Sequence, residues 1–232
     1  MESGKSQQSA KRLVVIACRV MEPELEAVRA DSPEVEIIYL EQGLHRTPKR
    51  LPELIQEKID QVESRATEIV LGYGLCSNGL VGITARCQKL IVPRCHDCIS
   101  LFLGSAARYD EIFRSRPGTY YLTSGWIVAK DDPLGIIEEY IPRYGSEAAE
   151  WIVKEELKNY THVTLINTGM KGIDPFRIRA IENAAFFKKK YDEITGSLEY
   201  FKEFICGPYS DERFLQFGPE TQITQEMFLG LD

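Results

Sequence analysis

The sequence lacks any apolar run long enough to cross a membrane. A transmembrane helix needs about 20 consecutive apolar residues, and no segment of the 232-residue chain approaches that length. Residues 1–12 are polar and lack the apolar stretch of a signal peptide. We therefore expect a disordered leader at 1–12 and a cytoplasmic protein.

The sequence also lacks an excess of positive charge. The chain carries 28 Lys and Arg against 35 Asp and Glu, which gives a net charge of −7. This balance argues against nucleic-acid binding, because phosphates attract basic surfaces. We expect a small molecule or another protein as partner, and neither nucleic acid nor membrane. The one basic cluster, Lys188–Lys190, is interpreted as the solvated end of a helix.

Cysteines are too few for a disulfide scaffold. Six of them in a chain of this length and class are expected to be free, redox-active or metal-bound, because cytosolic thiols are kept reduced. Cys87 and Cys206 lie outside the loops considered below. We interpret these two as ordinary packing or surface residues.

What is present in the first half is an alternation of strand and helix signals. Short apolar, β-branched runs predict strands, and apolar residues at three- and four-residue spacing predict helices. This order predicts an α/β fold, with a mostly parallel sheet, right-handed crossovers and flanking helices. The predicted strands are 13–17, 35–40, 68–73 and 90–92, and the predicted helices start near 22 and 51 and span 99–113.

The second half is less regular. A buried strand is predicted at 162–167 and an extended segment within 117–126, while the tail from 201 to 223 reads as strand and loop. Helices are predicted at 134–140, 146–159 and 174–191. Two interpretations stay open. The chain forms two similar lobes, residues 13–125 with the cysteine and histidine loops and residues 126–232 packed on them, or it forms one continuous domain.

Three predicted strands run out into loops that carry thiols and an imidazole. Cys18 ends the first strand, Cys76 follows the third, and His96 and Cys98 follow the fourth. The carboxyl ends of parallel strands meet at one edge, where α/β folds build their sites. Thiolate and imidazole are ligands that zinc prefers. The sequence therefore predicts a metal site, most simply zinc, formed by Cys18, Cys76, His96 and Cys98.

Other interpretations of these residues stay open. Cysteines from separate loops can hold an iron–sulfur cluster, and Cys95 with Cys98 has the spacing of a redox dithiol. Cys18 has the alternative of a packing residue at a strand end. Asp97 is expected to cap the following helix.

Two further residues are candidates for the same edge. His45 lies in the loop after the second strand, where it would act as a ligand or a general acid or base, or would pack against Pro48. Trp126 follows a glycine in a loop and is expected to wall a pocket, with core packing as the alternative.

The glycine-rich loop after the third strand is a candidate cofactor-binding segment. Its backbone N–H groups would bind an anion, or its glycines would permit tight turns close to a bound group. No Gly-Lys-Ser/Thr follows, so the loop is not a P-loop. The residues concerned are Gly72, Gly74, Asn78 and Gly79.

Several of these motifs together resemble a known family. They are Cys18, Leu44–Pro48, Gly72–Gly79, Pro93–Cys98 with Leu103–Ser105, and Pro117–Thr123 with Gly125–Trp126. Over roughly residues 12 to 215 the chain is similar to conserved prokaryotic proteins that carry a domain of unknown function. Members occur in anaerobic bacteria and methanogenic archaea, and some are encoded near corrinoid-dependent methyltransferases. The resemblance implies a context, corrinoid or methylamine metabolism, and no established activity.

That context suggests methyl or thiol transfer. Zinc methyltransferases of corrinoid systems use a His-x-Cys pair and a distant cysteine to activate a thiol. His96 and Cys98 with Cys76 have this composition, although Cys76 precedes the pair. The alternative is a non-enzymatic accessory protein that binds a corrinoid or a metal for a partner of the same system. Whether the protein is an enzyme stays open.

Overall fold

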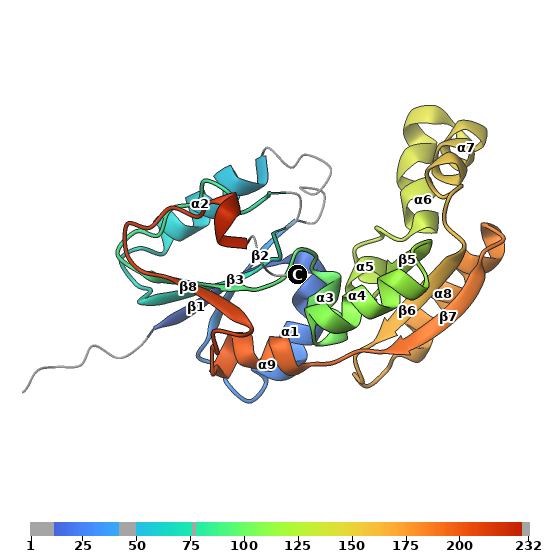
Figure 1. Cartoon of the computed structure of the whole chain (residues 1–232). Helices are drawn as coiled ribbons and strands as arrows, with labels where there is room; N and C mark the ends of the chain where they lie inside the picture. The colour runs from blue at the N-terminus through green and yellow to red at the C-terminus, as the bar shows by residue number, and fades with distance from the viewer. Residues whose placement is uncertain (1–11, 42–49, 76–77, 229–232) are drawn as a thin grey trace, which may run out of the picture.

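The computed structural model describes residues 12–41, 50–75 and 78–228 (Figure 1). Its larger sheet has the strand order β2-β1-β3-β4-β8. Strands β1 to β4 are parallel, and β8 is antiparallel to β4. This confirms the predicted mostly parallel α/β fold. The strands are β1 (Leu13–Cys18), β2 (Glu36–Leu40), β3 (Glu68–Gly72), β4 (Lys89–Pro93) and β8 (Phe214–Phe217).

The central strand β1 explains why its sequence is continuously apolar. It lies between β2 and β3, and residues 14–18 are buried on both faces of the sheet, as is usual for parallel strands covered on both sides. From β1 the chain first adds β2 on one side and then crosses to add β3 on the other. The connection therefore reverses direction between β1 and β3, which is the position where open α/β sheets bind ligands.

Helices surround this sheet. The chain leaves β1 through the short 3-10 helix η1 (Arg19–Met21) and α1, and it leaves β4 through α3 and α4. The ranges are α1 (Glu22–Arg29), α2 (Leu51–Gln61), α3 (Ile99–Leu103), α4 (Ala106–Ser115) and α9 (Glu199–Cys206). The predicted single helix over 99–113 is wrong, because Gly104 adopts φ +88° and ends α3. Ser105 then caps α4.

A second, three-stranded sheet follows, with the order β5-β6-β7 and all strands parallel. Figure 1 shows α6 and α7 projecting away from this sheet. The strands are β5 (Thr119–Leu122), β6 (His162–Asn167) and β7 (Lys190–Thr195). The helices are α5 (Ser124–Val128), α6 (Pro133–Tyr144), α7 (Ser146–Glu156) and α8 (Asp174–Phe186).

The C-terminal segment returns to the first sheet. Strand β8 pairs with β4, and Phe201 and Phe204 of α9 are buried in the same core as β1 and β3. The predicted second lobe, residues 126–232, therefore contains β6 and β7 but gives its last strand to the other sheet. The two sheets also differ in size, with five strands and three. The assignment of separate domains stays a prediction.

Two more segments differ from expectation. The helix predicted to continue to Tyr191 ends at Phe186, and β7 begins at Lys190, after Lys188 turns the chain with φ +54°. Residues 201–205, expected as strand, belong to α9. In the part of the chain that the structure describes, no helix has the length and apolar character needed to span a membrane.

Candidate functional site where the two sheets meet

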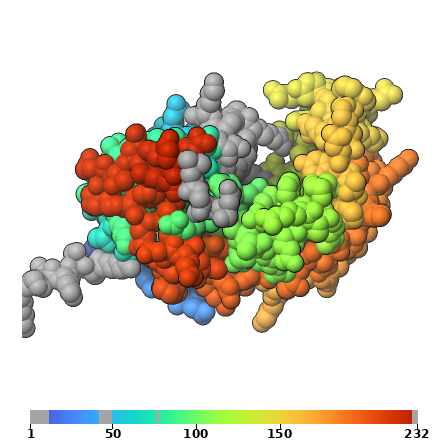
Figure 2. Space-filling model, in the orientation of Figure 1, coloured from blue at the N-terminus to red at the C-terminus, as the bar shows by residue number. Residues whose placement is uncertain are grey.

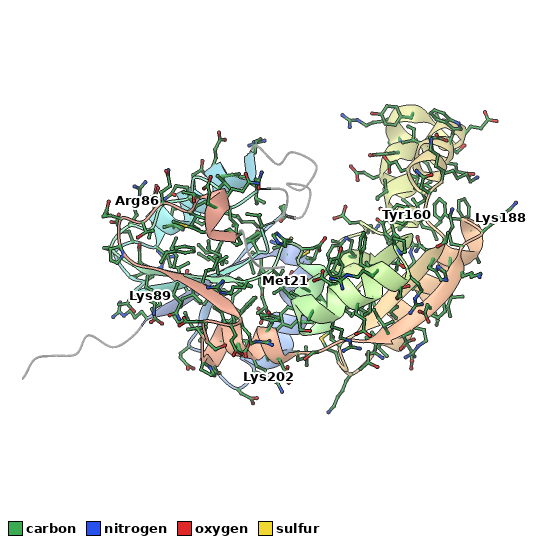
Figure 3. The ribbon with its side chains drawn as sticks, in the orientation of Figure 1. Met21, Arg86, Lys89, Tyr160, Lys188 and Lys202 are labelled. Carbon is green, nitrogen blue, oxygen red and sulfur yellow. The ribbon has the colours of Figure 1, made fainter. Side chains whose placement is uncertain are left out.

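The carboxyl ends of both sheets face each other. Glu24 lies on α1, which follows β1, and its Oε1 accepts hydrogen bonds from two residues of the second sheet's loops. Ser124, just after β5, donates at 2.8 Å, and Thr168, just after β6, donates at 3.2 Å. Figure 3 labels the neighbouring Met21 near this meeting point. We call this region the junction.

Backbone packing also fixes the junction. The amide of Ser197, after β7, donates to the carbonyl oxygen of Phe102 at 2.8 Å. A Cβ added to Gly125 would lie 1.7 Å from the carbonyl oxygen of Val20. Only glycine permits so close an approach between α5 and η1. Ends of strands from both sheets are thus held in direct contact.

Glu24 is an unusual residue for such a position. Its side chain is fully buried, and burial raises the pKa of Glu24 from 4.5 to about 7. The hydroxyls of Ser124 and Thr168 act in the opposite direction, because they stabilise the carboxylate. Near neutral pH the carboxyl therefore exchanges its proton, which is the property of a group that can serve as an acid or a base.

Cys18 lies at the point where the strand connection reverses. It ends β1 with only 1% of its surface exposed. Next to it, Ala17 pairs with Gly72 of β3, and a Cβ at Gly72 would lie 2.7 Å from the Ala17 Cβ. The close packing of β1 on β3 therefore requires glycine at position 72, and contact of Gly72 with a bound group stays a prediction.

The loop after β4 contacts the loop after β3. The amide of Leu75 donates to the carbonyl oxygen of Cys95 at 2.9 Å, and a Cβ on Gly74 would lie 3.1 Å from the same oxygen. The chain that leads to Cys76 is therefore bonded to the Cys95–Cys98 loop. His45 and Cys76 themselves lie outside the described residues.

The members of the 94–98 loop have different environments. Cys98 is 7% exposed at the start of α3, whereas His96 is exposed. Asp97 was expected to cap α3, but Cys98 occupies the N-cap position. Asp97, one residue earlier, still accepts a hydrogen bond on Oδ1 from the amide of Ile99 at 2.8 Å. Cys95 is fully buried, and its thiol lies close enough to Tyr200 to affect the pKa of that tyrosine.

The predicted metal site is incomplete within residues 12–41, 50–75 and 78–228. No three Cys, His, Asp or Glu side chains of these segments are grouped to bind a metal ion. The set of Cys18, Cys76, His96 and Cys98 stays a prediction that depends on Cys76.

In the glycine-rich loop after β3, at least one backbone amide is not available to bind an anion. Asn78 has φ +67°, and the amide of Gly79 donates to the carbonyl oxygen of Leu75 at 2.9 Å. That amide is used inside the turn, so it is not available to an anion.

An aromatic pocket lies beside the same loop. It has a volume of about 310 Å³. It is formed by the start of α3, by α4, β5 and α5, and by Tyr160, two residues before β6. Trp126 lines it from α5, not from a loop, and also packs against the core, so its role in binding stays a prediction. Among the described residues, its lining consists of Asp97, Ile99, Tyr109, Phe113, Pro117, Thr119, Tyr120, Tyr121, Trp126 and Tyr160. We call it the aromatic pocket.

The aromatic pocket adjoins the cysteine loop. Burial raises the pKa of Tyr109, and the negative charges of Asp97 and Cys98 raise it further. These two groups therefore lie within electrostatic reach of the Tyr109 hydroxyl. A buried thiol and an aromatic pocket thus share one corner of the junction.

Sequence reasoning missed Glu24 and most of the aromatic pocket. A signal for Glu24 exists, because it falls on the helical stripe of Met21, Leu25 and Val28. A carboxylate on an apolar stripe is a candidate for burial with a partner. No sequence pattern points to the aromatic pocket, because its rings come from separate helices and strands.

The comparisons give the chain a family. Residues 39–205, the greater part of the chain, match the family described as "Protein of unknown function (DUF1638)". No curated protein matches the chain, and no solved structure does.

Proposed function

We propose that this chain, which belongs to the DUF1638 family of proteins of unknown function, binds a small molecule at the junction beside a cysteine centre. One observation carries the proposal. The carboxyl ends of the parallel strands of the two sheets meet, as the hydrogen bonds of Glu24 with Ser124 and Thr168 demonstrate. Ligands of α/β folds bind outside the carboxyl ends of strands at such positions.

The cysteine centre is the reactive part of this proposal. Cys18 lies where the strand connection reverses, and Cys98 begins α3 next to the aromatic pocket. With Cys76 and His96 they have the donor types of a zinc site. Bound zinc would keep the thiols deprotonated at neutral pH.

Methyl or thiol transfer would follow if one coordination position stayed open for a substrate. The link to corrinoid metabolism is a prediction from the resemblance alone. A non-enzymatic accessory protein with the same ligands is the alternative. An iron–sulfur cluster at these cysteines would be recognised by brown colour and sensitivity to oxygen.

Metal analysis of the full chain, purified without a polyhistidine tag, tests the centre. We expect about one equivalent of zinc in the native protein and less than about 0.2 in Cys76→Ala and Cys98→Ala. Cys87→Ala is the matched control. Cys87 is exposed, and its thiol lies 3.7 Å from the carbonyl oxygen of Glu63.

Two results would contradict the zinc centre. The first is native protein with less than about 0.2 equivalents of metal after growth in zinc-supplemented medium. The second is equal loss of zinc in Cys87→Ala and Cys98→Ala, because a site-specific centre cannot depend on Cys87.

A further inference from the structure

We infer that the aromatic pocket binds a methylated ammonium cation. This inference names the ligand class for the junction and so rests on the proposed function, but it does not require the metal. Two observations carry it: the number of aromatic rings that wall the pocket, and the single carboxylate among its lining residues.

The rings come from two sides of β5. Tyr109 of α4 packs with Tyr121 of β5 at 6.2 Å between ring centroids. Tyr120 of the same strand meets Tyr160 edge to face at 5.3 Å, and Tyr160 is labelled in Figure 3. Trp126 adds an indole, whose position is set by Phe102 at 5.9 Å.

Such a lining suits a cation of low hydration. Aromatic rings present negative faces, so they attract ammonium groups electrostatically, and indole does so most strongly. A methylated ammonium ion also has apolar methyl groups, which gain free energy when they leave water for ring surfaces. A neutral apolar ligand would gain only the second contribution.

Asp97 supplies the complementary charge. Its Oδ1 accepts the hydrogen bond from the amide of Ile99. Within the described residues, Oδ2 makes no hydrogen bond or ion pair. A carboxylate in an aromatic pocket favours a cation and disfavours an anion. Its proximity to the rings is evident from its influence on the pKa of both Tyr109 and Tyr121.

Among the described residues, Arg116 is a cation close to the pocket and has to be considered. The charge of Arg116 also acts on Tyr121. Arg116 forms an ion pair with Asp192 of β7, however. At Tyr121 the charge of Arg116 still has a larger effect than that of Asp97, whereas at Tyr109 Asp97 is the charged group with the largest effect. The negative part of the pocket is therefore its Tyr109 side.

The aromatic pocket also lies close to the junction and to the cysteine centre. Figure 2 shows α4, in green, on the molecular surface between the two halves of the chain. Tyr109 of α4 is the residue that senses both Asp97 and the thiol of Cys98. A cation held by the rings would therefore lie next to the cysteine centre.

Tryptophan fluorescence measures the binding. The chain has two tryptophans, Trp126 and Trp151, and Trp151 is 66% exposed on α7. In a Trp151→Phe background the signal reports Trp126 alone. The probes are choline and its neutral isostere 3,3-dimethylbutan-1-ol. We expect choline to change the fluorescence and to bind at least about fivefold more tightly than the alcohol.

Variants locate the cation. Asp97→Asn keeps an oxygen for the amide of Ile99 but removes the charge, and Tyr160→Leu removes one ring. Each is expected to weaken choline binding at least about threefold. Asp97→Asn should leave the weak binding of the alcohol almost unchanged. Tyr144→Leu is the ring control, since Tyr144 is 52% exposed on α6.

Far-UV circular dichroism and zinc content of every variant separate the possible failures. Equal affinity for choline and the alcohol, or no binding of choline by folded native protein, overturns the cation inference. If zinc is then still bound, the proposed cysteine centre stands. If zinc is absent but choline binds selectively, the cation site stands without the metal.

Discussion

The carboxyl of Glu24 and the hydroxyl of Ser124 form a 2.8 Å hydrogen bond between the two sheets of the molecule. The bond joins residues 100 positions apart in the chain, and both side chains are buried. A carboxyl group in such a place makes the stability of the junction depend on pH.

The first prediction concerns this dependence. In the folded chain the pKa of Glu24 is about 7, whereas its ordinary value is 4.5. The folded state therefore binds the proton more tightly than the unfolded state. The stabilisation that this tighter proton binding by Glu24 gives the folded state is fully present below about pH 4.5 and is lost as the pH rises through about 7. The loss is about 3 kcal/mol.

Glu24→Gln isolates this effect, because glutamine keeps an oxygen for Ser124 but does not titrate. The difference in free energy of unfolding between the variant and the native protein should grow in the variant's favour from pH 5 to pH 8. Urea unfolding at both pH values measures it. Parallel pH profiles of the two proteins would show that Glu24 does not titrate in this range.

The second prediction concerns the hydroxyl itself. Donation from Ser124 lowers the pKa of Glu24, since it stabilises the carboxylate. Ser124→Ala should therefore raise the pKa of Glu24 above its native value. The carboxyl carbon resonance of Glu24, followed by NMR against pH, gives the shift. A lower pKa in the variant would contradict the assigned role of this hydrogen bond.

The third prediction tests backbone packing at the junction. Gly125→Ala places a Cβ 1.7 Å from the carbonyl oxygen of Val20, so α5 and η1 must separate. We expect a loss of at least about 2 kcal/mol in the free energy of unfolding. Gly218→Ala is the matched control, because a Cβ at Gly218 has no neighbour within 4 Å. Equal stability of the two variants would exclude tight packing at Gly125.

The fourth prediction tests a buried polar cluster in the second half of the chain. Asp132, 1% exposed, accepts hydrogen bonds from Arg179 Nε at 2.9 Å and Asn183 Nδ2 at 2.8 Å. Asp132→Ala should cost about 3 kcal/mol, because Asn183 and Arg179 lose a buried acceptor and Arg179 keeps only its more exposed partners Glu138 and Glu182. Thermal and urea unfolding measure the loss.

An exposed ion pair supplies the comparison for Asp132. Glu150 and Lys154 are four residues apart on α7, with side chains 39% and 50% exposed. Glu150→Ala should cost about 0.5 kcal/mol or less, because solvent screens such pairs. A similar cost for both variants would mean that Asp132 gains nothing from its burial.

Much of the first sheet could be predicted from the sequence. Runs such as Val14–Ala17 are apolar on both faces, and only a central parallel strand needs that pattern. Strand β7 could not, since Tyr191, Asp192 and Glu193 are polar enough to hide it. The side chains of Asp192 and Glu193 form ion pairs with Arg116 and Arg177 from other elements, and Tyr191 donates a hydrogen bond to Glu193. The pairing of β8 with β4 likewise joins segments that are far apart in the chain, so no local sequence pattern predicts it.

For the candidate site, the sequence predicted which edge of the sheet carries it better than which residues form it. Cys18 and the loops after β3 and β4 do meet at one edge, because parallel strands bring their carboxyl ends together. Glu24 was predictable from its place on an apolar stripe. The rings of Tyr109, Tyr121 and Tyr160 were not, because only the folding of α4 and β6 onto β5 brings them together.

The return of the chain to the first sheet makes the second sheet an insertion with two covalent links. The links run from Phe102 through α4 to β5, and from β7 to Ser197 and α9. The hydrogen bond between Phe102 and Ser197 holds the entry and the exit together. The inserted half is therefore tied to the first sheet where the chain enters and leaves it, and the contacts of Gly125 with Val20 and of Trp126 with Phe102 fix its position together with the hydrogen bonds of Glu24.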